Sequence, residues 1–252
     1  MTADKFTQIG TRHGLARVLS KLGLCSRSEA ERRIRDGRVS LDGRVIRDPE
    51  FPVAHAQHII EVDDIPLQAS IPVCIMLNKP RGLVTTAADE RQRDTVYRCF
   101  DGSDLPWIAP VGRLDKASEG LLLFCNDPKW AATITSPLTG PHKTYHVQID
   151  VIPDAALLAR LTLGVETDGT WLAAKSVRLL RTGRKNAWLE LVLDEGRNRH
   201  IRRLLAACDI TVLRLVRVAI GELSLEGLAK GHWRQLTRNE RDALAPEARQ
   251  GP

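Results

Sequence analysis

The stretch Val111-Gly-Arg-Leu-Asp-Lys-Ala-Ser-Glu-Gly-Leu-Leu-Leu-Phe-Cys-Asn-Asp127 joins a tight turn to an apolar run. The run 121–125 lies between a glycine and an Asn-Asp-Pro sequence, which is typical of a strand buried in a protein core. Asp115 is therefore expected in a loop directly before that strand, close to Arg113. A carboxylate held beside cations is expected to stay ionised, the form that acts as a nucleophile or a base. For this stretch alone, a turn aspartate that bonds its own backbone would be the simpler interpretation.

The composition indicates a globular protein with an anionic partner. The 252 residues carry a net charge of +6 with a pI near 9.3, which favours nucleic acid first and an anionic membrane surface second. No run of about 18 apolar residues and no signal-peptide pattern is present, so we expect no membrane span and a cytoplasmic location. Five scattered cysteines without a Cys-x-x-Cys pair indicate reduced thiols rather than a zinc site or disulfides.

Residues 11–65 have the pattern of a small basic module. Apolar residues at helical spacing predict a helix that ends at Gly23, and Ser26-Arg-Ser-Glu29 predicts the capping box of a second helix that runs through Arg35. Two alternating segments joined by Asp42-Gly43 predict a β-hairpin, and a further strand is expected at 58–62.

This module resembles the alpha-L RNA-binding domain first described in a ribosomal protein. The resemblance is carried by the segments 17–23, 25–30 and 37–43. It implies that the second helix and the hairpin face RNA, and that the contacts are made by Arg27, Arg32, Arg33 and Arg38. The alternative is that these arginines only form a solvated helix face.

The rest of the chain predicts a second, larger domain. Prolines bracket a linker at 66–72, and residues 73–245 contain alternating strand patterns with short helices between them. The predicted fold class is therefore α+β, with a mixed, mainly antiparallel sheet in the second domain. Residues 1–10 and 246–252 lack periodicity and are expected to be loose tails. Two modules joined by a linker suggest a monomer with a mobile front domain.

Four separated segments carry residues suited to chemistry. They are Leu77-Asn-Lys-Pro-Arg-Gly82, Gly112-Arg-Leu-Asp115 with Ser118-Glu-Gly120, Lys143-Thr-Tyr145, and Glu195-Gly-Arg-Asn-Arg-His-Ile-Arg-Arg-Leu204. Each would be weak alone. Together and in this order they resemble the bacterial ribosomal RNA pseudouridine synthases of the RsuA/RluB/RluE/RluF group, over nearly the whole chain. The resemblance implies site-specific isomerisation of uridine to pseudouridine in ribosomal RNA, with a lean toward the large subunit, by an aspartate-dependent mechanism with base flipping.

The resemblance also assigns roles to single residues. It makes Asp115 the aspartate that attacks the uridine, Tyr145 the ring that stacks on the uracil, and Arg202 the cation that pairs with the aspartate and orients it. Ile201 would pack near the base, and Lys79 would support the active-site loop. His200 stands where glutamine is common among relatives, so altered local contacts are expected there.

Further arginines are candidates for contacts with the substrate. Arg113 adjoins the aspartate, and Arg81, Arg91 and Arg93 lie on expected loops from which they could reach phosphate groups. The isomerisation involves no redox change and no net hydrolysis, so neither a metal nor a nucleotide cofactor is expected. Whether the aspartate adds to the ribose, adds to the base or removes a proton is left open.

Two other classes of function compete with this interpretation. The chain could be a non-catalytic RNA-binding or ribosome-assembly factor with a decayed synthase domain, although the joint presence of Asp115, Tyr145 and Arg202 argues against decay. A nucleoside hydrolase would usually need a carboxylate-rich metal site. His142 and His146 are four residues apart, but in a strand without a third ligand they are expected to be ordinary polar residues.

Overall fold

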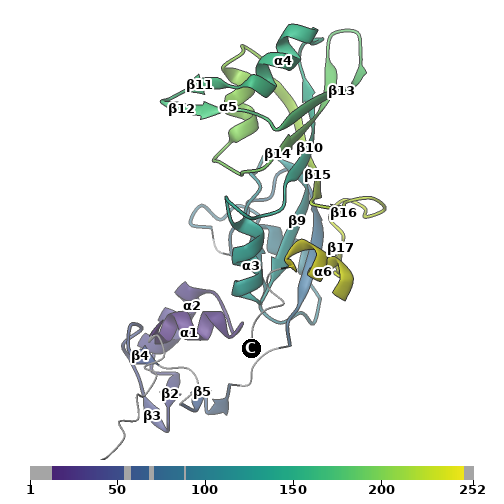
Figure 1. The fold of residues 1–252 in the computed structure, drawn as a ribbon. Helices are drawn as coiled ribbons and strands as arrows, with labels where there is room; N and C mark the ends of the chain where they lie inside the picture. The colour runs from purple at the N-terminus through teal and green to yellow at the C-terminus, as the bar shows by residue number, and fades with distance from the viewer. Residues whose placement is uncertain (1–12, 54–57, 68–70, 88, 247–252) are drawn as a thin grey trace, which may run out of the picture. The chain divides into compact units, whose positions relative to one another are not determined.

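The computed structural model describes residues 13–53, 58–67, 71–87 and 89–246 (Figure 1). Contacts divide the chain into two compact units, Met1–Val73 with Asp104–Ala109, and Cys74–Ser103 with Pro110–Pro252. The segment 104–109, which falls inside the predicted second domain, is thus assigned to the first unit. Apart from residue 246, the two expected tails lie outside the described residues, as do residues 68–70 of the expected linker.

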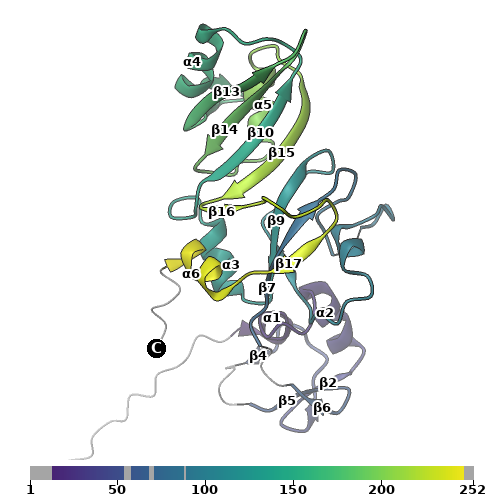
Figure 2. The same cartoon turned by 90° about the vertical axis from the view of Figure 1, so that its right-hand side faces the viewer.

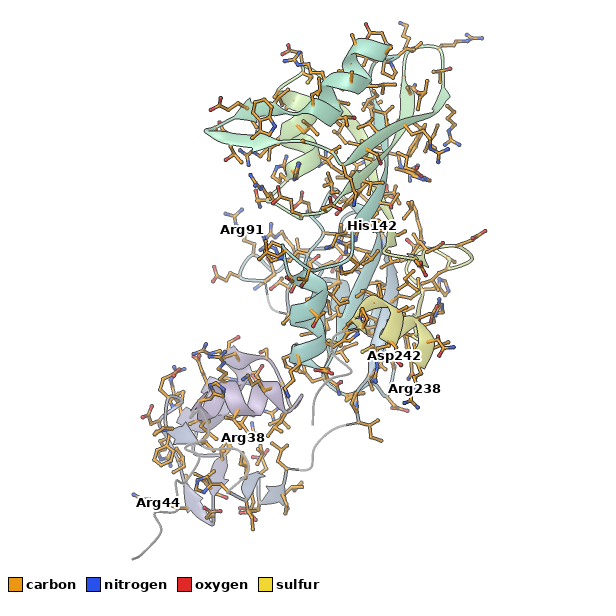
Figure 3. All side chains as sticks on the ribbon, viewed as in Figure 1. Arg38, Arg44, Arg91, His142, Arg238 and Asp242 are labelled. Carbon is orange, nitrogen blue, oxygen red and sulfur yellow. The ribbon has the colours of Figure 1, made fainter. Side chains whose placement is uncertain are left out.

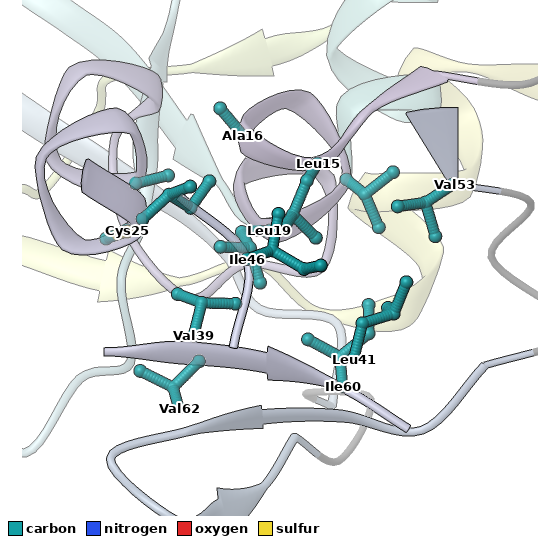
Figure 4. Packing of buried hydrophobic residues seen from close by; sticks show 13 residues of the cluster. Leu15, Ala16, Leu19, Cys25, Val39, Leu41, Ile46, Val53, Ile60 and Val62 are labelled. Atoms are coloured by element: carbon teal, nitrogen blue, oxygen red, sulfur yellow. The ribbon is translucent and has the colours of Figure 1, made fainter. Parts of the chain in front are cut away.

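The first unit packs two helices on a small antiparallel sheet. Helices α1 (Leu15–Lys21) and α2 (Arg27–Arg35) are followed by the strands of this sheet, in the spatial order β3-β2-β5-β6. The strand bounds are β2 Val39–Leu41, β3 Arg44–Val45, β5 Ile60–Val62 and β6 Ile65–Pro66, and β1 (His13–Gly14) pairs with β4 (Pro52–Val53). Buried aliphatic side chains from both helices and the sheet meet in one core (Figure 4). The predicted hairpin is confirmed, because Asp42 and Gly43 both adopt positive φ between β2 and β3.

The capping box predicted for α2 is only half formed. The Ser26 hydroxyl accepts a hydrogen bond from the Glu29 N–H at 3.2 Å, as expected of an N-cap. The Glu29 carboxylate does not reach back to the cap; it accepts hydrogen bonds from Arg32 and Arg33 instead. Charged donors on the next turn of the helix thus compete successfully for this carboxylate.

The second unit is built on one long mixed sheet. Its strands follow the order β13-β14-β10-β15-β9-β7-β17, with β16 beside β15 and β8 beside β9. The pair of β15 with β9 is parallel, and the pairs β13–β14, β14–β10, β10–β15, β9–β7, β7–β17 and β15–β16 are antiparallel, so the predicted mainly antiparallel sheet is confirmed. The strand bounds are β7 Cys74–Lys79, β8 Ala109–Val111, β9 Glu119–Cys125, β10 Lys143–Ile149, β13 Ser176–Thr182, β14 Ala187–Leu193, β15 Val212–Ile220, β16 Leu223–Ser224 and β17 Trp233–Gln235.

Short helices and one hairpin complete this unit. They are η2 Val96–Phe100, α3 Pro128–Thr135, α4 Ala155–Leu163, α5 His200–Ala206, α6 Arg238–Leu244, and the hairpin of β11 (Val165–Thr167) and β12 (Thr170–Leu172). Figure 2 shows β13, β14, β10 and β15 side by side with α5 behind them. Helix α5 therefore covers one face of these four strands.

The sheet narrows where β9 meets β15. These strands pair only through Glu119 with Val216 and Gly120 with Arg217. Gly120 has φ +104°, and a Cβ at this position would lie 2.2 Å from the Arg217 carbonyl oxygen. Only glycine permits this approach, in which the Arg217 Nε donates a 2.7 Å hydrogen bond to the Leu121 carbonyl. The stretch 111–127 thus connects the two halves of the sheet.

Candidate active site

A cavity of about 380 Å³ opens in the second unit beside this junction. It collects residues from three of the four predicted segments: Asp115 from the loop before β9, Tyr145 from β10, and Arg202 from α5. Arg113 and Ile201, which were predicted to contact substrate, line the same cavity. Residues more than 80 positions apart in the sequence therefore share one concave surface, as a site for a small group requires.

The loop that carries Asp115 is fixed by groups that lie beneath it. The Lys79 side chain is completely buried, and its Nζ donates to the carbonyls of Pro80, Asp115 and Ser118 at 3.1, 3.3 and 2.8 Å. Burial lowers the pKa of Lys79 to about 8. These contacts match the support of the loop that the resemblance implies for Lys79.

Thr85 is a second anchor of this loop, and it was not predicted. Its hydroxyl donates to the Leu114 carbonyl at 2.7 Å and accepts from the Leu114 N–H at 3.3 Å. The loop closes on itself through the Ser118 N–H, which donates to the Asp115 carbonyl at 2.9 Å. A threonine in a loop has no sequence signature that separates this role from solvent exposure, so only the fold reveals it.

The pairing of the aspartate differs from the prediction. Arg199, rather than Arg202, forms the ion pair with Asp115, at 3.8 Å between Nη1 and Oδ2. Arg202 reaches the same loop but donates from Nη2 to the Ala117 carbonyl at 3.3 Å. The difference arises at the start of α5, where Arg199 is the N-cap residue with φ +49°. Burial, followed by the nearby Arg199, lowers the pKa of Arg202.

Tyr145 forms part of the cavity wall. It is 9% exposed and lies opposite Arg217 on β15 and Leu191 on β14. The other tyrosine of the chain, Tyr97, packs edge-to-face against Phe124 in the core, with ring centroids 5.9 Å apart. Tyr145 is therefore the tyrosine that is placed to meet a ligand in the cavity.

Within the described residues, three buried side-chain atoms lack a hydrogen-bond partner: His200 Nδ1, Arg202 Nε and Arg217 Nη2. All three residues line the cavity. His200 Nε2 donates to the Ala173 carbonyl at 3.1 Å, and because burial lowers the pKa of His200, Nδ1 is left as an acceptor. Unsatisfied polar atoms carry a free-energy cost, and their concentration at one cavity indicates a site that a polar ligand completes.

The arginine-rich segment 195–204 divides its side chains by spacing. Arg199 and Arg202, three residues apart, face the Asp115 loop. Arg197, His200 and Arg203, also three apart, donate instead to the carbonyls of Trp171, Ala173 and Thr167, in or next to the β11–β12 hairpin. The histidine at the unusual position belongs to this second group, whereas the predicted cation, Arg202, belongs to the first. This segment thus contacts the Asp115 loop on one side and the β11–β12 hairpin region on the other.

Comparison with known proteins identifies the family. Residues 73–207 match the family model described as RNA pseudouridylate synthase, and residues 14–59 match the S4 domain. The chain belongs to the RNA pseudouridylate synthase family. The predicted enzyme class is thereby confirmed, and so is the small RNA-binding domain in front of the catalytic one.

Relatives extend over most of this pseudouridylate synthase. An uncharacterised RNA pseudouridine synthase of Rickettsia bellii is 35% identical over 89% of this chain and 96% of its own length. The ribosomal large subunit pseudouridine synthase B of Bacillus subtilis is 34% identical over 90% of this chain and 93% of its own. A crystal structure of a pseudouridylate synthase superposes with a TM-score of 0.65 at 29% identity, over 93% of this chain and 100% of that one.

The remaining arginines predicted to bind the substrate differ in their exposure and in their ion pairs. A second hollow of about 430 Å³, lined by Arg91, Arg93 and Arg113, borders Asp115 from the side of residues 84–93. Arg93 is bound there to Asp89 at 2.6 Å, whereas Arg91 is exposed (Figure 3) and makes no ion pair within the described chain. Arg81 is exposed and lines neither hollow.

In the S4 domain of this synthase, every arginine predicted to face RNA has an acidic partner. Arg27 pairs with Glu50 at 2.8 Å and also with Glu31; Arg32 and Arg33 share Glu29; Arg38 binds Asp63 with two hydrogen bonds. Hydrogen bonds from Arg32 and Arg33 lower the pKa of Glu29 to about 2. Arg44, on the hairpin and labelled in Figure 3, is exposed and has no ion pair among the described residues.

The described parts of the chain contain neither a metal-binding cluster nor a membrane-spanning helix. No group of three or more His, Cys, Asp or Glu side chains suited to a metal ion occurs in the described parts of the chain. His146 instead lies 3.4 Å from Glu190, in a strand as expected. No helix in those parts is long and apolar enough to span a bilayer.

Proposed function

We propose that this chain converts a specific uridine of large-subunit ribosomal RNA to pseudouridine, with Asp115 as the attacking group. The observation that carries the proposal is the single cavity shared by Asp115, Tyr145 and the guanidinium groups of Arg199 and Arg202. The large subunit is favoured because the relative from Bacillus subtilis is named for it. The S4 domain supplies a second RNA-binding surface.

The geometry supports a mechanism in which the target nucleotide leaves its stack. The flipped uracil stacks on the Tyr145 ring, which stabilises the extruded base by roughly 1–3 kcal/mol. Arg199 forms an ion pair with the Asp115 carboxylate, and Arg202 fixes the loop of this aspartate through the Ala117 carbonyl. In the reaction, the N-glycosidic bond breaks and leaves its electron pair on uracil N1, and the uracil turns. Its C5 then bonds to the ribose carbon and loses its proton while N1 takes up a proton, so the product is an isomer of the substrate and the carboxylate is regenerated.

Loss of the C5 hydrogen gives a direct assay. Purified protein is incubated with ribosomal RNA labelled with tritium at uridine C5, using large-subunit and small-subunit RNA separately. We expect wild-type protein to release tritium from large-subunit RNA, and Asp115→Ala to release none while it still binds the RNA. An exposed acid elsewhere in the unit, Asp101, provides the matched control, because Asp101→Ala is expected to retain release.

Each competing function predicts a different result in this assay. Wild-type protein that binds ribosomal RNA but releases no tritium from either subunit would be a non-catalytic RNA-binding factor. Release of free uracil from the RNA would indicate a hydrolase. Tritium release from small-subunit RNA alone would retain the chemistry but contradict the assignment of the subunit.

Two further features concern RNA contacts of the S4 domain and the oligomeric state. We infer that Arg27, Arg32, Arg33 and Arg38 contact RNA by exchanging their carboxylate partners for phosphates, since exposed ion pairs stabilise by only about 0–1 kcal/mol. We also infer a monomer in the cytoplasm, because two modules with separate RNA-binding surfaces need no second copy. Light scattering of the purified chain tests the oligomeric state.

A further inference from the structure

The β11–β12 hairpin presents an exposed tryptophan beside the cavity. The chain has five tryptophans, and Trp171 on β12, 59% exposed, is the one that ranks among the exposed large apolar side chains. A single exposed apolar residue is common on protein surfaces and needs no explanation by itself. What distinguishes Trp171 is how firmly the surrounding chain holds it and where it is held.

Three side chains of the segment 195–204 fix the hairpin. Arg197 donates from Nη1 to the Trp171 carbonyl at 3.2 Å, His200 from Nε2 to the Ala173 carbonyl at 3.1 Å, and Arg203 from Nη2 to the Thr167 carbonyl at 3.0 Å. Arg197 and His200 also line the cavity. The hairpin is therefore tied by hydrogen bonds to two residues of the cavity wall, although its own residues do not line the cavity.

The indole itself is seated against the backbone. At Gly164, which has φ +96°, a Cβ would lie 2.5 Å from the Trp171 Nε1. The Nε1 edge of the indole thus occupies space that is open because residue 164 is glycine, while more than half of Trp171 is exposed to solvent. An aromatic ring fixed in this way loses little conformational entropy when a ligand stacks on it.

The charge around this ring favours nucleic acid. Arg197 is bound to Glu195, but Arg199, on the same segment, is 53% exposed and only 3.8 Å from Asp115. Glu166, the cross-strand neighbour of Trp171, is the one carboxylate placed directly opposite it. A planar apolar ring beside exposed guanidinium groups is the combination that binds single-stranded nucleotides.

We propose that Trp171 stacks on a base that neighbours the target uridine in the RNA strand, and so acts as a substrate-positioning residue at the rim of the cavity. This inference rests on the proposed function, since it assumes an RNA strand that enters the cavity. It adds a second stacking ring to Tyr145: one ring holds the flipped base and the other holds its neighbour.

Steady-state kinetics with the tritiated large-subunit RNA test the inference. Trp171→Ala is expected to raise KM about 10-fold with kcat within a factor of 3, whereas Trp171→Phe, which keeps a ring, stays within 3-fold of the wild-type KM. Leu163, 75% exposed and next to Gly164, provides the control, because Leu163→Ala should leave KM unchanged. Glu166→Gln is expected to lower KM slightly, because it removes a negative charge beside the RNA.

A fluorescence measurement gives a second readout. Stacking quenches an indole, so RNA should quench the wild-type protein more than Trp171→Phe at the same bound fraction. Equal KM values for wild type and Trp171→Ala, or an equal rise in KM for Leu163→Ala, would overturn the inference. So would loss of self-association in Trp171→Ala with KM unchanged, which would assign the ring to a contact between copies. Absence of tritium release by wild type, in contrast, would count against the proposed function itself.

Discussion

The S4 arginines that were predicted to face RNA and two arginines of the cavity wall, Arg202 and Arg217, have partners of different kinds. In the S4 domain, Arg32, Arg33 and Arg38 bind carboxylates of their own domain. In the catalytic unit, Arg202 and Arg217 donate to backbone carbonyls instead. A carboxylate neutralises the guanidinium charge, whereas a carbonyl fixes the side chain and leaves its charge uncompensated. The local electrostatic potential therefore depends on what the arginines bind more than on how many arginines are present.

This difference matters for what each region can do. Paired surface arginines keep a domain soluble and can exchange their partner for a phosphate at small cost. Arginines fixed on carbonyls are preorganised, so they can stabilise charge in a reaction without rearranging. Arg202 and Arg217 are thus fixed in place before a ligand binds, whereas the paired arginines of the S4 domain must first leave a carboxylate.

The largest effect on stability is expected at Gly120, where the backbones of β9 and β15 approach most closely. Gly120→Ala would place a Cβ 2.2 Å from the Arg217 carbonyl oxygen at φ +104°. We expect a loss of roughly 4 kcal/mol of unfolding free energy from combined strain and overpacking. Gly227→Ala is the control, since its φ of +77° costs strain alone and nothing lies within 4 Å. Urea unfolding that shows equal losses for the two variants would contradict the tight junction.

The second prediction concerns preorganised charge. Arg202→Met should lower kcat by roughly 100-fold, because the Asp115 loop loses a donor and the cavity loses a charge. Stability should change little, since the partner is a carbonyl that water can satisfy. Arg199→Met removes the 3.8 Å ion pair to Asp115, but the Arg199 side chain is 53% exposed, so kcat should fall less than in Arg202→Met. A larger loss for Arg199→Met, measured by tritium release, would mean that Arg199 is the main orienting cation.

Much of this organisation could be predicted from local patterns in the sequence. The hairpin at Asp42-Gly43, the buried strand after Gly120 and the helix over 238–244 all have signals confined to a few residues. Helix α3 was not predicted although Asp127 caps it and Pro128 begins it, and the Asp168-Gly169 turn between β11 and β12 was also passed over. Both the helix and the turn could have been predicted from the sequence, because each follows a known cap or turn rule.

Other features could not be read because they depend on contacts between distant segments. The family motifs locate Asp115, but its partner is chosen by the backbone conformation of Arg199 at the start of α5. Thr85 and Trp171 carry no motif, and the hydrogen bonds of Thr85 to Leu114 and of Arg197 to the Trp171 carbonyl become visible only in the fold. Partner choice is a tertiary property, and spacing along the chain does not determine it.

The third prediction uses the buried amine beneath the catalytic loop. The pKa of Lys79 is about 8 in the folded chain, below its usual 10.5. Between these values the unfolded chain binds more protons, so this group makes the unfolding free energy rise with pH. From pH 8 to 9.5 the rise should be roughly 2 kcal/mol in wild type and absent in Lys79→Met. Urea unfolding across that range checks it, and parallel pH profiles for the two proteins would contradict a buried, titrating Lys79.

The smallest effects are expected in the S4 domain, where they separate paired from unpaired arginines. Arg44→Ala should weaken RNA binding about threefold and reduce the salt slope by about one, since an uncompensated charge is lost. Arg32→Ala should weaken it less, because Arg32 must first leave Glu29. Glu29→Gln should act in the opposite direction, since it frees both Arg32 and Arg33. Fluorescence anisotropy with labelled ribosomal RNA at several salt concentrations measures all three. If Arg44→Ala and Arg32→Ala lose equal affinity with equal salt slopes, the carboxylate partners do not restrain these arginines, and the contrast between the two regions lies only in the catalytic unit.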